Sequence, residues 1–235
     1  MASVKENKKK EASALIHNYL IAYNAIQTIG WSFLLYQLIT YYLSQNDAKS
    51  DKSLYDTVKY TLIIFQNAAI LEVIHAFLKF VSSNPIVTVQ QISSRVIVVC
   101  GVLMVTESSR ESLGLPLALF AWSVTEVIRY GNYTFTLLGY VPYFIKWLRY
   151  TTFIILYPIG VTGELLCLYA AQWEIRKTGF LSVQMPNTLN FIFNYSHFLI
   201  LVMTMYIPFF PQLYLHMFTL RRKVLGGQTP VKKLS

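Results

Sequence analysis

Residues 147–172, "WLRYTTFIILYPIGVTGELLCLYAAQ", are the stretch of sequence that decides the fold. Apolar side chains fill most of it, and a helix needs about 20 apolar residues to cross a bilayer. Two residues are unusual there. Pro158 removes a backbone hydrogen bond and bends a helix, and Glu164 is an acid at membrane depth. We therefore expect a membrane-spanning helix that also carries a functional site.

The rest of the chain has the same character. Of its 235 residues, 54% are hydrophobic and 13% charged, whereas soluble domains carry about 25% charge. The mean hydropathy is +0.44. This composition predicts an all-α polytopic membrane protein, a bundle of six transmembrane helices in a single membrane domain over 1–235. The expected spans are 16–43, 57–81, 86–106, 112–133, 147–172 and 189–217, with terminal tails at 1–15 and 218–235.

Basic residues outside the spans or near their ends predict the orientation. Six spans place both termini on one side, which carries twelve Lys and Arg residues against six on the other. The larger set is Lys5, Lys8, Lys9, Lys10, Lys79, Lys146, Arg149, Arg221, Arg222, Lys223, Lys232 and Lys233, and the smaller is Lys49, Lys52, Lys59, Arg110, Arg176 and Lys177. Because basic residues accumulate on the cytosolic side, we expect both termini in the cytosol. The last four residues, "KKLS", have the form of a dilysine signal for retrieval to the endoplasmic reticulum.

The net charge of +9 is explained by this topology, so we expect no nucleic-acid partner. Inside the spans, ionisable groups cost roughly 2.5–3.5 kcal/mol each on insertion. They are Glu72, His75, Arg95, Glu126, Arg129 and Glu164. Their charges nearly balance, and structural ion-pair networks also perturb ionisable groups. We therefore favour interhelical ion pairs for Glu72, Arg95, Glu126 and Arg129, and a hydrogen-bonded core role for His75.

Other site chemistries are not favoured. Glu72 and His75 share a helix face, and such an "ExxH" is half of a carboxylate-bridged metal site. The chain has no second "ExxH", so we expect no metal. A P-loop, a dinucleotide fingerprint, a nucleophilic Ser or Cys arrangement and a phosphatase loop are also missing from the sequence. We expect no cofactor.

Tyr157 and Glu164 are the strongest catalytic candidates. Seven residues make two helical turns, so the two side chains lie on one face, about 10 Å apart along the axis. Gly160 and Gly163 leave bare backbone that another helix or a substrate can approach closely. A carboxyl removed from water can exchange protons near neutrality, and a tyrosine hydroxyl can donate one. This pair suits elimination of water from a β-hydroxy thioester, but a kinked core helix with a paired acid explains the same residues.

Several stretches together resemble the very-long-chain (3R)-3-hydroxyacyl-CoA dehydratases, a family also called protein-tyrosine-phosphatase-like. They are "LEVIHAFL" at 71–78, "QISSR" at 91–95, "WSVTEVIRYGNY" at 122–133, "LRYTTFIILYPIGVTGE" at 148–164 and "PFFPQLYLHMFTLRRKVL" at 208–225. The resemblance implies dehydration of a long-chain (3R)-3-hydroxyacyl-CoA to the trans-2-enoyl-CoA, the third step of fatty-acid elongation. It also implies an endoplasmic reticulum location and, as partners, other elongation enzymes (an elongase, a ketoreductase and an enoyl reductase).

The resemblance carries the catalytic pair over to Tyr157 and Glu164, without assigning which is the base. Arg95, Glu126, Arg129, Gly160, Lys146 and Arg149 are candidates for substrate contacts. We expect the acyl chain among the helices and the CoA phosphates at the cytosolic mouth, near Lys79, Arg129, Lys146, Arg149 and residues 221–223. Each of those cations is also explained as an anchor on the cytosolic side. Two alternatives are a catalytically inert scaffold of the same family and a small polytopic transporter.

Overall fold

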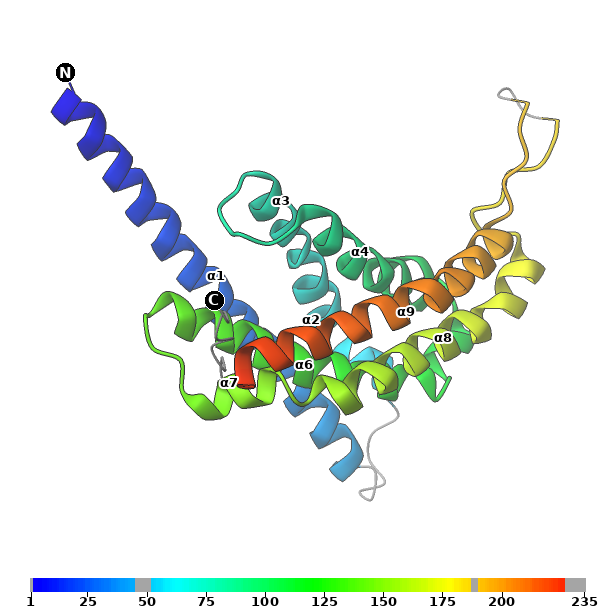
Figure 1. Ribbon diagram of the computed structural model, residues 1–235. Helices are drawn as coiled ribbons and strands as arrows, with labels where there is room; N and C mark the ends of the chain where they lie inside the picture. The colour runs from blue at the N-terminus through cyan, green and yellow to red at the C-terminus, as the bar shows by residue number, and fades with distance from the viewer. Residues whose placement is uncertain (1, 45–51, 187–189, 227–235) are drawn as a thin grey trace, which may run out of the picture.

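The computed structural model describes residues 2–44, 52–186 and 190–226, and this part of the chain is helical (Figure 1). It contains no strand, only an isolated bridge between Val183 and Phe193. The dilysine motif lies outside the described residues. The helices are α1 (Ala2–Ser44), α2 (Leu54–Ala68), α3 (Ile70–Phe77), α4 (Pro85–Val96), the π-helix η1 (Ile97–Leu103), α5 (Glu107–Arg110), α6 (Gly114–Leu137), α7 (Tyr143–Arg149), α8 (Phe153–Thr178) and α9 (Tyr195–Leu225).

Four described helical segments are long and apolar enough to cross a membrane. They are Leu54–Phe77, Pro85–Leu103, Phe153–Thr178 and Tyr195–Leu225, and they match four of the six expected spans. The other two, 16–43 and 112–133, are helical within α1 and α6 but are not among the four. These two helices are less apolar because they carry polar residues, such as Gln27 on α1 and Glu126 on α6. Both of these side chains are almost fully buried. The described part of the chain is therefore helical, with four segments that suit a membrane protein, and the count of six spans is not confirmed.

The core forms where α6 packs against α1 and α8, the two most extensive helix contacts. Trp31 and Trp122 are among the largest fully buried side chains. The contact between α6 and α8 depends on glycine. A Cβ at Gly163 would stand 2.5 Å from the backbone nitrogen of Ala118 and 2.8 Å from the carbonyl oxygen of Gly114, so a larger residue would force the helices apart.

α8 continues as helix on both sides of Pro158, and the bend expected at that residue stays a prediction. An interruption lies earlier, at 150–152, where α7 ends and α8 begins. Proline lacks the N–H that would bond to the carbonyl four residues back. Here the Tyr214 hydroxyl of α9 donates to that carbonyl, on Ile154, at 3.0 Å. The helix continues because a side chain of the neighbouring helix satisfies the carbonyl.

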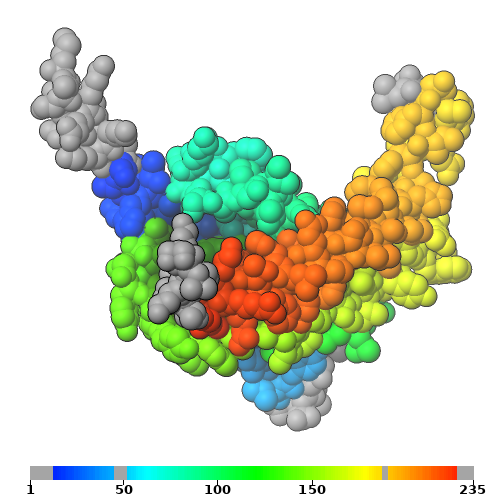
Figure 2. All heavy atoms as spheres, viewed as in Figure 1, coloured from blue at the N-terminus to red at the C-terminus, as the bar shows by residue number. Residues whose placement is uncertain are grey.

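α9 is the least buried of these long helices. It lies alongside α8 (Figure 1), and among the described helices α8 is the only one that it contacts extensively. Its fully buried residues, Tyr195, Ser196 and Leu199, all lie in its first two turns. Figure 2 shows α9 as a continuous band across one face of the molecule. Most of this helix is therefore available to lipid.

Candidate active site

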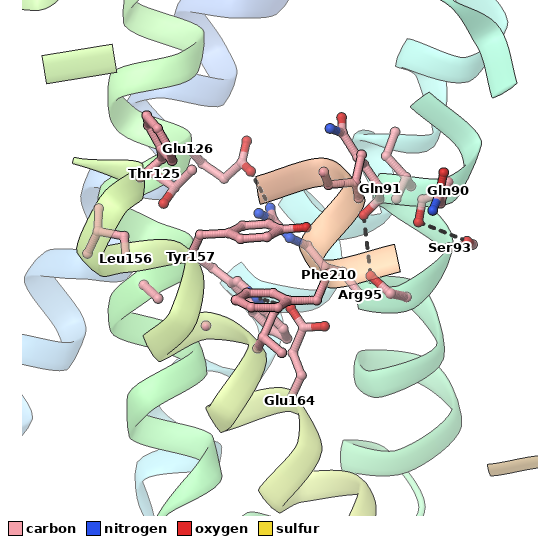
Figure 3. A pocket seen from close by; sticks show the side chains of 18 of the residues that line it. Gln90, Gln91, Ser93, Arg95, Thr125, Glu126, Leu156, Tyr157, Glu164 and Phe210 are labelled. Atoms are coloured by element: carbon pink, nitrogen blue, oxygen red, sulfur yellow. Dashed lines mark hydrogen bonds and ion pairs between the residues drawn. The ribbon is translucent and has the colours of Figure 1, made fainter. Parts of the chain in front are cut away.

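A cavity of about 350 Å³ lies between α8, α9, α4 and α6, with α1 and α2 at its inner side. It is lined by most of the residues singled out from the sequence: Tyr157, Glu164, Gly160, Arg95, Glu126, Arg129 and Arg149. Lys146 is not among the lining residues. Figure 3 shows Tyr157, Glu164, Arg95 and Glu126 directed into this space from three different helices. The cavity therefore unites residues that are up to 69 positions apart, from Arg95 to Glu164.

Glu164 is almost fully buried, and both of its carboxylate oxygens accept hydrogen bonds. The indole Nε1–H of Trp122, on α6, donates to Oε1 at 2.8 Å. The hydroxyl of Tyr206, on α9, donates to Oε2 at 2.5 Å. Two donors on one carboxyl group suit its ionised form, which only accepts hydrogen bonds. The arrangement can therefore hold an oriented carboxylate away from bulk water.

Tyr157 is fixed by stacking. Its ring lies nearly parallel to that of Phe210, with centroids 5.3 Å apart, and to that of Tyr214, at 6.0 Å. Figure 3 shows the first of these stacks beside Glu164. Within the part of the chain that the structure describes, the Tyr157 hydroxyl makes no hydrogen bond. A stacked ring is held in place, so this hydroxyl can meet a substrate in a defined position.

The other buried charges form one connected network. Arg129 on α6 donates to both oxygens of Glu72 on α3, each at 2.7 Å, and to Glu126 at 2.7 Å. Arg95 on α4 forms an ion pair with the second oxygen of Glu126, and the Tyr130 hydroxyl donates to Glu72. The expected interhelical ion pairs are therefore confirmed. Since three of these residues line the cavity, the network also forms part of its wall.

His75 takes the core role expected of it. It is buried, and its Nε2 lies 2.9 Å from the Tyr19 hydroxyl. Glu72 engages Arg129 and Tyr130, so the two members of the "ExxH" have separate partners. Among the described residues, no group of three His, Cys, Asp or Glu side chains is placed as a metal site requires.

Arg149, at the end of α7, extends the cavity wall toward the expected cytosolic side. Its Nη2 donates to the Tyr133 hydroxyl at 3.0 Å, and its guanidinium lies 4.8 Å from the centre of that ring. No carboxylate forms an ion pair with it in the described part of the chain. An unneutralised guanidinium at a cavity wall suits an anionic ligand group.

Trp122, Tyr206 and Phe210 are site residues that the sequence did not single out. Trp122 lies within the quoted stretch 122–133, but nothing in its spacing connects it with Glu164, 42 positions later. Phe210 lies within the quoted stretch 208–225 and Tyr206 two residues before it, but no spacing connects either of them with Tyr157 or Glu164. Only the packing of α6 and α9 on α8 shows their role.

A comparison with models of protein families shows which family the chain belongs to. The family model described as "Protein tyrosine phosphatase-like protein, PTPLA" matches residues 66–227, more than half of the sequence. The chain belongs to this family.

The PTPLA-family chain is also similar to curated proteins over most of its length. It is 44% identical to "Very-long-chain (3R)-3-hydroxyacyl-CoA dehydratase 2" of Mus musculus, over 96% of this chain and 88% of the relative. It is 44% identical to "Very-long-chain (3R)-3-hydroxyacyl-CoA dehydratase hpo-8" of Caenorhabditis elegans, over 93% and 99%. For the dehydratase PASTICCINO 2 of Arabidopsis thaliana the identity is 36%, over 88% and 93%. No solved structure matches the chain.

Although the family is described as phosphatase-like, the cavity is not lined by a cysteine that could act as a nucleophile. Cys167 is completely buried in the core, and the Cys100 thiol lies 3.4 Å from the side-chain oxygen of Asn67. Neither cysteine lines the cavity. In this PTPLA-family chain, the groups available for chemistry there are carboxylate, hydroxyl and guanidinium.

Proposed function

We propose that the protein dehydrates long- and very-long-chain (3R)-3-hydroxyacyl-CoA to trans-2-enoyl-CoA, with Tyr157 and Glu164 as the catalytic pair. The observation that supports this most is the meeting of the two residues in one cavity, in a chain 44% identical to named dehydratases. The substrate needs a base at C2 and an acid at the C3 hydroxyl. The cavity offers a carboxylate and a free phenol.

Glu164 is the base and Tyr157 the acid in this mechanism. Glu164 accepts from Trp122 and Tyr206, so it already has the partners of a carboxylate. It removes the C2 proton, the C2–C3 double bond forms, and the C3–O bond breaks. Tyr157 gives its proton to the departing hydroxyl, which leaves as water. The proton on Glu164 then returns to Tyr157, so the enzyme ends the cycle unchanged.

The CoA phosphates bind at the cytosolic mouth. Arg149 lines the cavity, and Arg221 carries a buried Nε that has no hydrogen-bond partner among the described residues. Lys79, Lys146, Arg222 and Lys223 add positive charge around this mouth. Arg95, Glu126, Arg129 and Gly160 line the inner part of the cavity, where the thioester and the start of the acyl chain lie.

The cellular setting completes the proposal. The chain spans the endoplasmic reticulum membrane six times, as one domain over 1–235, with α1 and α6 as the two more polar spans. Both termini are cytosolic, and "KKLS" serves as the retrieval signal. The elongase, ketoreductase and enoyl reductase of the elongation cycle are its partners, because they supply its substrate and consume its product.

Turnover by the purified protein tests the activity. Wild-type protein in lipid vesicles should convert a C18 (3R)-3-hydroxyacyl-CoA to the enoyl-CoA, followed by product mass. Glu164→Gln is the matched control, since it keeps the side-chain shape and removes the base. Wild-type protein that folds but yields no enoyl-CoA would favour the inert scaffold over the enzyme.

A further inference from the structure

α9 presents one row of aromatic side chains to both members of the proposed catalytic pair. Tyr206, Phe210 and Tyr214 are spaced four residues apart, so they lie on one helix face. Phe210 and Tyr214 stack on Tyr157, whereas Tyr206 donates to Glu164 at 2.5 Å. Tyr206 also lines the cavity. Its hydroxyl therefore lies at the proposed reaction centre and not in the packed interior of the bundle.

The two hydrogen bonds on Glu164 come from two different helices that pack against α8. Trp122 belongs to α6, which is packed closely against α8 at Gly163, so its bond is held by the core. Tyr206 belongs to α9, which has few buried residues of its own. A carboxylate oxygen can accept two hydrogen bonds, so each oxygen of Glu164 keeps a lone pair. With both donors in place the carboxylate cannot rotate freely.

From this geometry we propose that Tyr206 is a positioning residue for the dehydration. Its O–H and the Trp122 N–H together fix the orientation of the Glu164 carboxylate, with a free lone pair directed at the C2 proton. Tyr206 does not exchange a proton with the substrate. This inference rests on the proposed function, because it assigns Tyr206 a part in that reaction.

The test compares two tyrosines of the same helix. Tyr206→Phe removes the donor to Glu164 and keeps the ring. Tyr195→Phe is the matched control, since its hydroxyl donates to the backbone carbonyl of Gly101 at 2.9 Å and it does not line the cavity. We expect Tyr206→Phe to lower kcat and kcat/KM equally, by about 10- to 100-fold, as loss of a supporting hydrogen bond does elsewhere. Tyr195→Phe should lower only the Tm.

A substrate deuterated at C2 supplies a second readout that lost stability alone does not change. If Glu164 is misdirected, removal of the C2 proton becomes slower, and the isotope effect on kcat should be larger in Tyr206→Phe than in wild type. It should be unchanged in Tyr195→Phe. If Tyr206→Phe does not fold, Trp122→Phe, which removes the other donor, should give the same lower kcat and larger isotope effect.

The outcomes separate this inference from the proposed function. Wild-type kcat, or an unchanged isotope effect, in Tyr206→Phe would overturn the role of Tyr206 while the dehydratase activity stands. If Tyr195→Phe lost as much kcat as Tyr206→Phe, Tyr206 would have a structural role only. An inactive wild type, or full activity in Glu164→Gln, would overturn the proposed function and the inference with it.

Discussion

At the scale of single residues, Tyr157 and Glu164 are expected to carry the chemistry. Tyr157→Phe and Glu164→Gln should each lower kcat by about 10²–10⁴-fold, the usual contribution of a positioned acid or base. Folding should be retained, because Phe keeps the stack on Phe210 and Gln keeps an oxygen for Trp122. Turnover and Tm of the purified variants measure both effects. Full activity in either variant would remove that residue from the mechanism.

The ion pair between Arg95 and Glu126 makes a second prediction. Glu126 is almost fully buried, and Arg95→Met leaves it with Arg129 as its remaining ion-pair partner, so stability should fall by less than the roughly 3–5 kcal/mol that an unpaired buried charge costs. The double variant Arg95→Met with Glu126→Gln should lose less stability than the two single variants combined, because Arg129 keeps Glu72 as its partner. Denaturation of all four proteins tests this. A stable Arg95→Met protein without activity would instead make Arg95 a substrate contact.

At this scale the sequence predicted which residues share a helix face and that ion pairs form, but not which helix supplies each partner. The two-turn spacing of Tyr157 and Glu164 predicted that they share a face, and the balance of buried charges predicted ion pairs. Trp122 and Tyr206 could not be predicted as partners of Glu164. Their hydrogen bonds join different helices, and periodicity within one helix does not indicate which neighbour it will face.

At the scale of the helix, Pro158 connects α8 with α9. Pro158→Ala supplies an N–H for the Ile154 carbonyl, which now accepts from Tyr214. Alanine improves helix propensity over proline by about 3 kcal/mol, so Tm should rise. Activity should fall, because competition for the carbonyl loosens Tyr214 and the stack on Tyr157. A variant that is more stable and equally active would show that the proline has no part in catalysis.

Gly160 and Gly131 allow a matched test of the space between helices. A Cβ at Gly160 would lie 3.3 Å from that of Ala121, beside the cavity. Gly160→Leu should therefore raise KM and lower turnover, most strongly for substrates that are bulky near the thioester. Gly131→Leu adds the same side chain to α6 where no atom lies within 4 Å, and turnover should be retained. Equal kinetics in the two variants would place the acyl chain elsewhere.

The sequence predicted where helices lie along the chain better than where they end or which of them are apolar enough to cross a membrane. The four apolar segments follow directly from runs of hydrophobic residues, which is the property that a bilayer selects. The interruption at 150–152 was missed because Pro158 is the stronger sequence signal, yet Tyr214 compensates for it. α1 and α6 are not among the four because their polar residues lower the apolar character of these helices.

At the scale of the whole molecule, the distribution of basic residues predicts the topology. Tags at either terminus should react with a membrane-impermeant reagent from the cytosolic side of intact microsomes. A tag within 46–52 should react only after the membrane is opened, because that connector follows the first span. A luminal C-terminus would contradict six spans and would leave "KKLS" without a retrieval role.

The exposure of α9 has a consequence for how the protein handles substrate length. A cavity of about 350 Å³ is at the small end of the range for drug-sized ligands, so it holds the reacting end of a very long acyl chain and not the whole tail. α9 forms one wall and faces lipid along most of its length. The remaining methylene groups can therefore stay among the lipid tails, which solvate them as well as a protein tunnel would. Under the proposed function, the bilayer forms the rest of the binding site, and the protein need not grow with its substrate.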